Sequence, residues 1–316
     1  MRGSRGGSAV DLSTSVGSVA LPNPVLTASG TSGHGAELSA YFDLASLGAV
    51  VVKSLSASPW PGNPAPRVHE TASGMLNSVG LQGPGVEAWM EHDLPPLLAT
   101  GARVVASIWG TSTEGYGKAA AMLASAPPGV VAVEVNLSCP NVEERQRVFA
   151  HSAPATAEAV AAVVAASPGR PLWAKLSPNV TDVTAIAGAA LGAGASALTL
   201  VNTVMGMAID PATRRPVLGG GGGGLSGPAI HPVAVRAVYE CRAAFPEAPI
   251  VGVGGVASGA DAVELLVAGA SAVQVGTATF ADPRAPARVL NELQEWCRRH
   301  NVPRLVELIG ASHDPG

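Results

Sequence analysis

The sequence has few aromatic residues, few charged residues and only three cysteines, and each shortage excludes a class of proteins. Aromatic residues make up 4% of the 316 residues, which leaves no stacking surface for single-stranded nucleic acid. Charged residues make up 13%, and the net charge of −4 without a basic run argues against a nucleic-acid partner. Cys139, Cys241 and Cys297 lie far apart, so they predict neither a disulfide framework nor a four-cysteine iron–sulfur cluster held by this chain alone. We therefore expect a protein of the reducing cytoplasm.

The chain also lacks an N-terminal apolar run of signal-peptide length. We interpret residues 1–9 as a flexible lead and residues 10–316 as a single domain. The uncharged stretch Val183–Ile209 is long enough to span a bilayer, but it contains several glycines and Asn202 and changes from a helix-like to a strand-like pattern. It therefore predicts a buried helix followed by a buried strand, and no membrane span.

Hydrophobic residues make up 47% of the chain, and their pattern predicts an α/β fold. Eight short apolar runs are the predicted strands: Pro24–Ala28, Val50–Ser54, Val104–Ile108, Val131–Asn136, Leu172–Leu176, Ala197–Asn202, Ile250–Gly254 and Ala272–Gly276. Continuous apolar runs are typical of parallel strands covered on both faces, and segments such as Ala155–Ala166 and Asp261–Ala268 between them have helical spacing. We predict a (β/α)8 TIM barrel, with an open doubly wound sheet as the alternative. The segment Val10–Leu21 is predicted to form a hairpin that closes the bottom of the barrel.

Polar residues stand at or near the carboxyl ends of four predicted strands: Lys53, Asn136, Lys175 and Asn202. In a barrel these ends converge on the face where such enzymes place their chemistry. An unpaired ammonium is costly to bury, so an anionic or electron-rich group, such as a reduced flavin ring, is expected above the two lysines. The alternative is that each lysine extends from its strand to solvent.

Cys139 follows a predicted strand within the sequence NLSCPN, residues 136–141. A free thiol, with a pKa of about 8.5, needs only a modest lowering of that pKa to act as a base near neutrality. The alternative is a small buried apolar residue, which is the ordinary role of a lone cysteine. The flanking Asn136 and Asn141 favour the functional interpretation.

Glycine-rich segments belong to the last third of the chain: Gly219–Gly224, Val251–Gly255 and Val275–Ala278. Barrels often bind phosphate through backbone N–H groups after their last strands, although the six consecutive glycines are also consistent with a mobile lid. The segment Gly252–Ala257 loosely fits a dinucleotide-binding fingerprint, but no acidic residue follows at the required distance. The seven histidines show no metal-ligand spacing, and no metal site is predicted.

Ten motifs occur in a fixed order between about Asp11 and Arg304. They are ASG (Ala28–Gly30), VVKS ending at Ser54, NPAPR (Asn63–Arg67), GMLNSVGLQGPG (Gly74–Gly85), NLSCPNV (Asn136–Val142), KLSPNVTD (Lys175–Asp182), VNTVMGMAID (Val201–Asp210), GGLSGPA (Gly223–Ala229), VGVGGV and VGTA. In this order the motifs resemble those of the family 1 dihydroorotate dehydrogenases, especially the type that pairs with an iron–sulfur flavoprotein subunit and delivers electrons to NAD.

This resemblance implies FMN-dependent oxidation of (S)-dihydroorotate to orotate in pyrimidine biosynthesis. Cys139 matches the base that removes the C5 proton while the C6 hydride passes to flavin N5, and Lys53 is the second catalytic candidate. The positions that match the substrate shell are Lys53, Asn77, Gly80, Leu81, Asn136, Asn141, Asn202 and Thr203. The positions that match FMN contacts are Ala28, Ser29, Lys53, Ser54, Ser107, Asn136, Lys175, Val201, Ser226, Gly227, Gly254, Gly255, Gly276 and Thr277. The resemblance also implies an iron–sulfur flavoprotein partner and a homodimeric core.

Two departures from the family pattern keep alternatives open. Ser107 stands where the family usually has asparagine, which weakens one expected contact, and Val142–Ala153 replaces a glycine-rich loop. One alternative is a paralogous FMN oxidoreductase for another dihydropyrimidine-like or unsaturated substrate, since this loop is the expected lid. The other is a non-catalytic barrel subunit, which the presence of Cys139 with both lysines disfavours.

Overall fold

The computed structural model describes residues 10–138, 140–141, 147–166 and 169–313. Its centre is a sheet of eight parallel strands: β3 (Val25–Thr27), β4 (Val50–Val51), β7 (Val104–Ile108), β8 (Val130–Asn136), β11 (Leu172–Lys175), β12 (Ala197–Leu200), β17 (Ile250–Val253) and β18 (Ala272–Val275). Strands that follow one another in the sequence are neighbours in this sheet. A parallel bridge between Leu26 and Ala49 joins β3 to β4 and closes the sheet. The predicted (β/α)8 barrel and its eight strands are confirmed.

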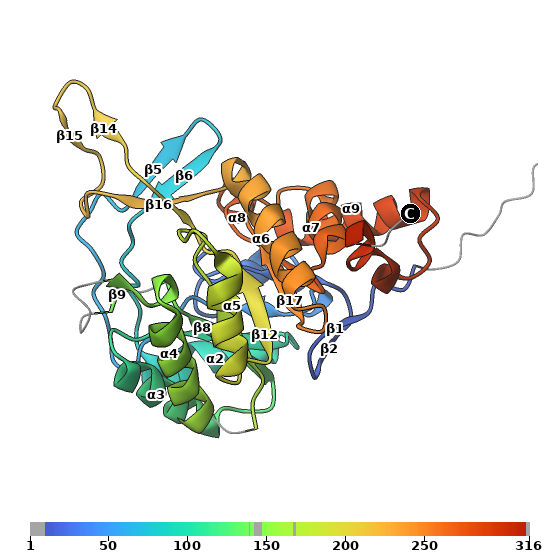
Figure 1. Ribbon diagram of the computed structural model, residues 1–316, viewed down its shortest axis with the longest axis horizontal. Helices are drawn as coiled ribbons and strands as arrows, with labels where there is room; N and C mark the ends of the chain where they lie inside the picture. Colours follow the sequence, from blue (N-terminus) through green and yellow to red (C-terminus); the bar gives the residue numbers. More distant parts are fainter. Residues whose placement is uncertain (1–9, 139, 142–146, 167–168, 314–316) are drawn as a thin grey trace, which may run out of the picture.

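Helices follow the strands and surround the barrel (Figure 1). They are α1 (Val86–Ala88), α2 (Leu94–Ala99), α3 (Thr113–Met122), α4 (Ala153–Ala166), α5 (Val183–Gly192), α6 (His231–Ala244), α7 (Gly259–Ala268), α8 (Ala278–Ala281) and α9 (Ala285–Arg299). A π-helical turn, Trp89–Asp93, joins α1 to α2, and two 3-10 turns, Glu37–Ala40 and Leu44–Ser46, stand after β3 in place of a longer helix. Further 3-10 turns are Leu123–Ser125, Phe149–His151, Pro228–Ile230, Leu305–Leu308 and Ala311–His313.

Side-chain caps explain where two of these helices begin. Asp182 accepts a hydrogen bond from the backbone N–H of Thr184 at 2.9 Å and so caps the first turn of α5. Ser258 and Asp261 form a capping box at the start of α7. The uncharged stretch Val183–Ile209 thus contains α5 and then β12, as predicted. Within the described ranges, no helix is long and apolar enough to cross a membrane.

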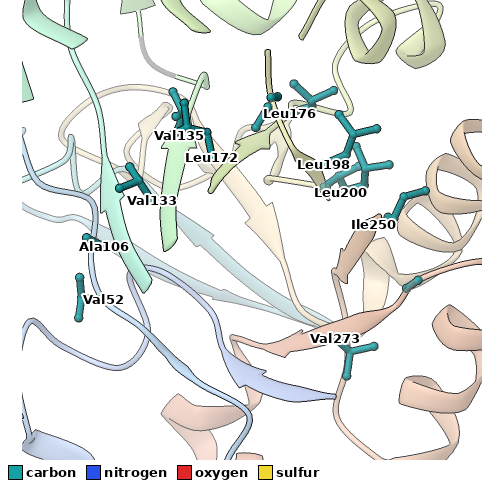
Figure 2. Packing of buried hydrophobic residues seen from close by; sticks show 14 of the residues in the cluster. Val52, Ala106, Val133, Val135, Leu172, Leu176, Leu198, Leu200, Ile250 and Val273 are labelled. Atoms are coloured by element: carbon teal, nitrogen blue, oxygen red, sulfur yellow. The ribbon is translucent and has the colours of Figure 1, made fainter. Parts of the chain in front are cut away.

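Apolar side chains on the strands pack against the helices in one large buried cluster. Figure 2 shows part of it, in which Val133 and Val135 extend from one strand and Leu198 and Leu200 from another. A second cluster fills the amino end of the barrel, where Trp173 packs with residues of the hairpin formed by β1 (Thr14–Val16) and β2 (Val19–Leu21). The predicted hairpin is therefore confirmed, and the amino end of the barrel is apolar.

A small antiparallel sheet projects from the other end of the barrel, away from β1 and β2 (Figure 1). Its strands are β5 (Val68–Thr71), β6 (Gly74–Asn77), β13 (Val204–Gly206) and β16 (Gly223–Ser226), in the order β13-β16-β6-β5. Two short hairpins accompany it: β14 (Ile209–Asp210) with β15 (Arg215–Pro216), and β9 (Pro140–Asn141) with β10 (Arg147–Val148). This sheet joins the loop after β4 to the loop after β12, and no sequence pattern predicted it.

Candidate active site

A cavity of about 340 Å³ lies where the carboxyl ends of the barrel strands meet the small sheet. The residues that line it and were predicted as site residues are Ala28, Ser29, Lys53, Ser54, Asn77, Gly80, Leu81, Asn136, Lys175, Val201, Asn202, Thr203, Ser226, Gly227, Gly254, Gly255, Gly276 and Thr277. They come from segments dispersed over most of the chain and converge because parallel strands bring their carboxyl ends to one face. Among the predicted residues whose side chains the structure describes, only Ser107 is not among them.

Lys175 is the last residue of β11 and is almost completely buried, with 3% of its surface exposed. Its Nζ donates hydrogen bonds to Glu134 Oε1 at 3.4 Å, to Gln274 Oε1 at 3.2 Å and to Ser29 Oγ at 3.3 Å. The side chain therefore remains at the base of the cavity, and the alternative that it extends to solvent is wrong for this lysine.

Lys53 follows β4 and lines the same cavity. Burial lowers the pKa of its ammonium, and the positive charge of Arg67 lowers that pKa further. No hydrogen bond joins Lys53 Nζ to another of the residues that the structure describes. This cation is thus available to an anionic or electron-rich ligand.

Amide and hydroxyl groups at the strand ends form a connected row. Asn202 Nδ2 donates to Asn136 Oδ1 at 3.1 Å, and Asn136 Nδ2 donates to Ser54 Oγ at 3.1 Å. The hydroxyl of Ser54 lies 2.9 Å from that of Ser107. Ser107 is fully buried and does not line the cavity, so it supports Ser54 rather than reaching a ligand as predicted. Such a row fixes the donors and acceptors before a ligand binds.

Glycines shape the wall near the start of α6. Gly254, Gly255 and Gly227 have φ values of 141°, 71° and 97°, and a Cβ on Gly255 would lie 2.6 Å from His231 Cβ. The Thr277 hydroxyl donates to Ser226 Oγ at 2.8 Å beside them. Backbone N–H groups at such turns, hydroxyls and the start of a helix together favour an anion such as phosphate.

A second tight turn, Gly80–Leu81, follows Asn77 in the sequence and also lines the cavity. Both residues have positive φ, 70° for Gly80 and 63° for Leu81. A Cβ on Gly80 would lie 2.5 Å from Asn63 Cγ, so this position requires glycine. The turn is consistent with the predicted contact between its backbone N–H groups and a carboxylate.

Cys139 and the first five residues of the predicted lid, 142–146, lie outside the described residues. Asn141 belongs to β9, and the structure describes its backbone and not its side chain. Ser138, which precedes Cys139 in the sequence, lines the cavity. The roles of Cys139 and Asn141 therefore stay predictions.

The last two of the six glycines at 219–224 form part of a strand of the small sheet. Gly223 and Gly224 lie in β16, which comes before β17, and Gly224 pairs with Asn77 of β6. A Cβ on Gly224 would lie 2.0 Å from Thr203 Oγ1, and one on Gly223 would lie 2.6 Å from Asn77 O. These glycines allow the small sheet to approach the strand ends closely.

Two polar residues of the barrel interior were missed as site residues, Glu134 and Gln274. Each is flanked on both sides by apolar residues of its strand, Glu134 in VAVEV and Gln274 in AVQV, and that isolation was the available signal. Other lining residues were also missed, most of which lie on the small sheet or on loops: Gly30, Thr31, Val68, Met75, Ser78, Val79, Ser138, Met205, Gly224, Ile230, Val253 and Phe280.

Lysines, amides and glycine-rich turns lie at the carboxyl ends of the strands of a (β/α)8 barrel. This is the organisation of a barrel enzyme that binds a phosphate-bearing cofactor. The family model described as dihydroorotate dehydrogenase matches residues 11–297. Among curated relatives, the protein of Geobacter sp. strain M21 is 48% identical over 95% of this chain and 98% of its own length. The protein of Desulforudis audaxviator strain MP104C is 47% identical over 97% of this chain and 99% of its own length. Both are named dihydroorotate dehydrogenase B (NAD(+)), catalytic subunit.

The chain belongs to the dihydroorotate dehydrogenase family, a family of oxidoreductases. Membership in this family implies a flavin cofactor. The cavity fits such a group, because it combines a buried cation, hydrogen-bonding amides and a turn region in which glycines keep side chains away from an anion.

Proposed function

We propose that this chain oxidises (S)-dihydroorotate to orotate with FMN as cofactor, as the catalytic subunit of a pyrimidine-biosynthetic enzyme of the cytoplasm. The observation that carries this proposal is that one cavity is lined by two lysines, three asparagines and the glycine-lined turn region. The names of the relatives support the reaction, since they are called dihydroorotate dehydrogenase.

FMN would lie with its phosphate at the glycine-lined end and its ring near Lys175. Gly254, Gly255 and Gly276, with the hydroxyls of Ser226 and Thr277, would hold the phosphate. Bound FMN would supply the two-electron acceptor that amino-acid side chains lack. Ala28, Ser29, Ser54 and Val201 line the same cavity and would contact the remainder of the cofactor.

The substrate shell is supported by the chemistry of its side chains. Asn77, Asn136 and Asn202 each carry both donors and acceptors, which suits a pyrimidine ring with both kinds of group at its edge. The Lys53 ammonium and the Gly80–Leu81 turn would bind the substrate carboxylate. Each group left unpaired in a site without water would cost about 1–3 kcal/mol, so the fixed row of amides selects for a ring of matching pattern.

Cys139 would remove the C5 proton of the substrate, since its neighbour Ser138 lines the cavity and a thiolate is a competent base near neutral pH. Asn141 would complete the amide shell. Both assignments come from the NLSCPN motif.

Electron transfer to NAD would require a second chain. This chain has only three cysteines, too few for a four-cysteine cluster. Because the relatives are named catalytic subunits, we propose an iron–sulfur flavoprotein partner and a homodimeric core.

The test is anaerobic titration of the purified protein with dihydroorotate while the visible flavin absorbance is recorded. Bleaching in proportion to added substrate is expected. A parallel titration with dihydrouracil, which has the ring without the carboxylate, should leave the absorbance unchanged. Bleaching by dihydrouracil alone would replace the proposal with a different dihydropyrimidine substrate, and a protein that cannot bind FMN would refute it.

A further inference from the structure

Three buried side chains form a closed hydrogen-bonded triangle below the cavity. Lys175 Nζ donates to Glu134 Oε1 at 3.4 Å and to Gln274 Oε1 at 3.2 Å, and Gln274 Nε2 donates to Glu134 Oε2 at 2.7 Å. The Glu134 side chain is completely buried and that of Lys175 is 4% exposed. Glu134 and Gln274 do not line the cavity, whereas Lys175 does.

The arrangement indicates a charged pair. The Gln274 amide directs its nitrogen to Glu134 and its oxygen to Lys175, which is the orientation that a carboxylate and an ammonium require. Among the residues that the structure describes, Glu134 is the only carboxylate within ion-pair distance of Lys175. Removing it would leave a buried charge without compensation.

The triangle also determines where the ammonium presents its remaining donor. Two of the three N–H groups of Lys175 are engaged from the barrel interior, by Glu134 and Gln274. The third contacts Ser29 Oγ, which belongs to the cavity wall. The ammonium is thus bound by Glu134 and Gln274 on the side of the barrel interior and has one N–H group on the side of the cavity. A ligand atom could accept a hydrogen bond from that N–H group, either in place of Ser29 Oγ or together with it.

We propose that Glu134 is a positioning residue that sets the reduction potential of the flavin bound above Lys175, an inference that rests on the proposed function. Reduction adds negative charge to the flavin ring, and a bare ammonium next to the ring would stabilise the reduced form strongly. The carboxylate of Glu134, on the side of Lys175 that faces away from the cavity, offsets the positive charge that the flavin would otherwise experience. It therefore keeps the potential low, so that the reduced cofactor remains able to pass its electrons to an acceptor.

The decisive variant is Glu134→Gln, which keeps the shape of the side chain and removes its charge. The measurement is the two-electron midpoint potential of the flavin-loaded protein, obtained by anaerobic equilibration with a reference dye and without dihydroorotate. The equilibrium constant for reduction should rise at least tenfold, which corresponds to about 30 mV for a two-electron couple. A folded, flavin-loaded E134Q protein with the wild-type potential would overturn the proposal.

Thr199→Val is the matched control for packing. Thr199 is fully buried, pairs in register with Lys175, and has a hydroxyl without a hydrogen-bond partner in the described part of the chain. Its substitution should leave the potential unchanged. A shift in T199V equal to that in E134Q would show that disturbed packing, and not charge, is responsible, and would also overturn the proposal.

If E134Q does not retain flavin, Glu134→Asp decides the question. Aspartate keeps the charge but withdraws it from Lys175, so the potential should rise, and an unchanged potential would count against the role of Glu134. The dye titration also separates the two proposals. Wild-type protein without flavin would refute the proposed function, whereas flavin-loaded variants with unshifted potentials would refute only the role of Glu134.

Discussion

Asn202 and Asn136, which are 66 residues apart in the sequence, are joined by a hydrogen bond of 3.1 Å from Asn202 Nδ2 to Asn136 Oδ1. The bond connects the ends of two barrel strands and continues through Asn136 Nδ2 to the hydroxyl of Ser54. Each amide is therefore fixed in one orientation, and the cavity presents a defined set of donors and acceptors before any ligand arrives.

Asn202→Ala should lower kcat/KM for dihydroorotate about tenfold or more, because a buried polar group that loses its partner costs about 1–3 kcal/mol. Flavin content should stay that of the wild type. Asn291→Ala is the control, since Asn291 is exposed on α9 and does not line the cavity. Equal kcat/KM values for N202A and N291A, from steady-state kinetics, would contradict a role for Asn202 in the substrate shell.

Cys139→Ser should slow flavin reduction by dihydroorotate at neutral pH by about 10²-fold or more, since a hydroxyl is a much weaker base than a thiolate. The rate should recover as the pH is raised, and flavin binding should not change. Stopped-flow absorbance under anaerobic conditions measures the step.

Cys241→Ala is the matched control for this cysteine. Burial raises the pKa of the Cys241 thiol to about 12, so it stays protonated and inert at neutral pH. Its loss should leave the rate of flavin reduction unchanged. An unaltered rate in C139S would remove Cys139 from the mechanism.

The alkaline limb of the pH profile should report Lys53. Burial, and then the charge of Arg67, lower the pKa of its ammonium, so Lys53 loses its proton at a lower pH than an ordinary lysine, whose pKa is about 10.4. Binding of the anionic substrate should therefore weaken as the pH rises through this lowered value. Steady-state kcat/KM measured across the alkaline range should show the decline.

Arg67→Gln should move that decline to higher pH, because it removes the neighbouring positive charge. Arg67→Lys keeps the charge while losing the guanidinium hydrogen bonds to Asn63 O and Pro61 O, and it should leave the pH of the decline in place. Identical profiles for both variants would mean that another group controls the alkaline limb.

Gly224→Ala should raise KM and destabilise the protein by about 1–3 kcal/mol, because the added Cβ would lie 2.0 Å from Thr203 Oγ1. Gly222→Ala is a close control, since its nearest neighbours would be Gly206 O at 3.4 Å and Met207 Cε at 4.0 Å. Thermal unfolding together with KM distinguishes the two. Equal KM values and equal melting temperatures for the two variants would show that the small sheet can shift at Gly224 to accommodate the added Cβ.

The barrel could be predicted because its strands are buried on both faces and so appear as continuous apolar runs such as VVASI at Val104–Ile108. The residues that line the cavity could be predicted in large part for a geometric reason. A polar side chain at the end of a parallel strand, such as Asn136 or Lys175, has to face the same end of the barrel as the others.

The small sheet could not be predicted, because its strands are short and gain their stability from partners far away in the sequence. Asn77 Nδ2 donates to Gly224 O across a separation of 147 residues, and six consecutive glycines carry no strand signal. The contact between Glu134 and Gln274 could not be predicted for the same reason, because Gln274 lies 140 residues further along the chain. Local patterns indicate that a residue is unusual without indicating what it contacts.

The sheet that unites β6 with β16 ties two distant loops into one cooperative unit above the barrel. The backbone hydrogen bonds between β6 and β16 are lost from both loops if either loop opens, so we expect these two strands to become accessible to solvent in a single sub-global opening event. Amide protons of Met75–Asn77 and of Gly224–Ser226 should accordingly exchange with deuterium at one shared rate, faster than amides of the barrel strands. Entry to the cavity would then be governed by the opening frequency of this unit rather than by the movement of either loop alone.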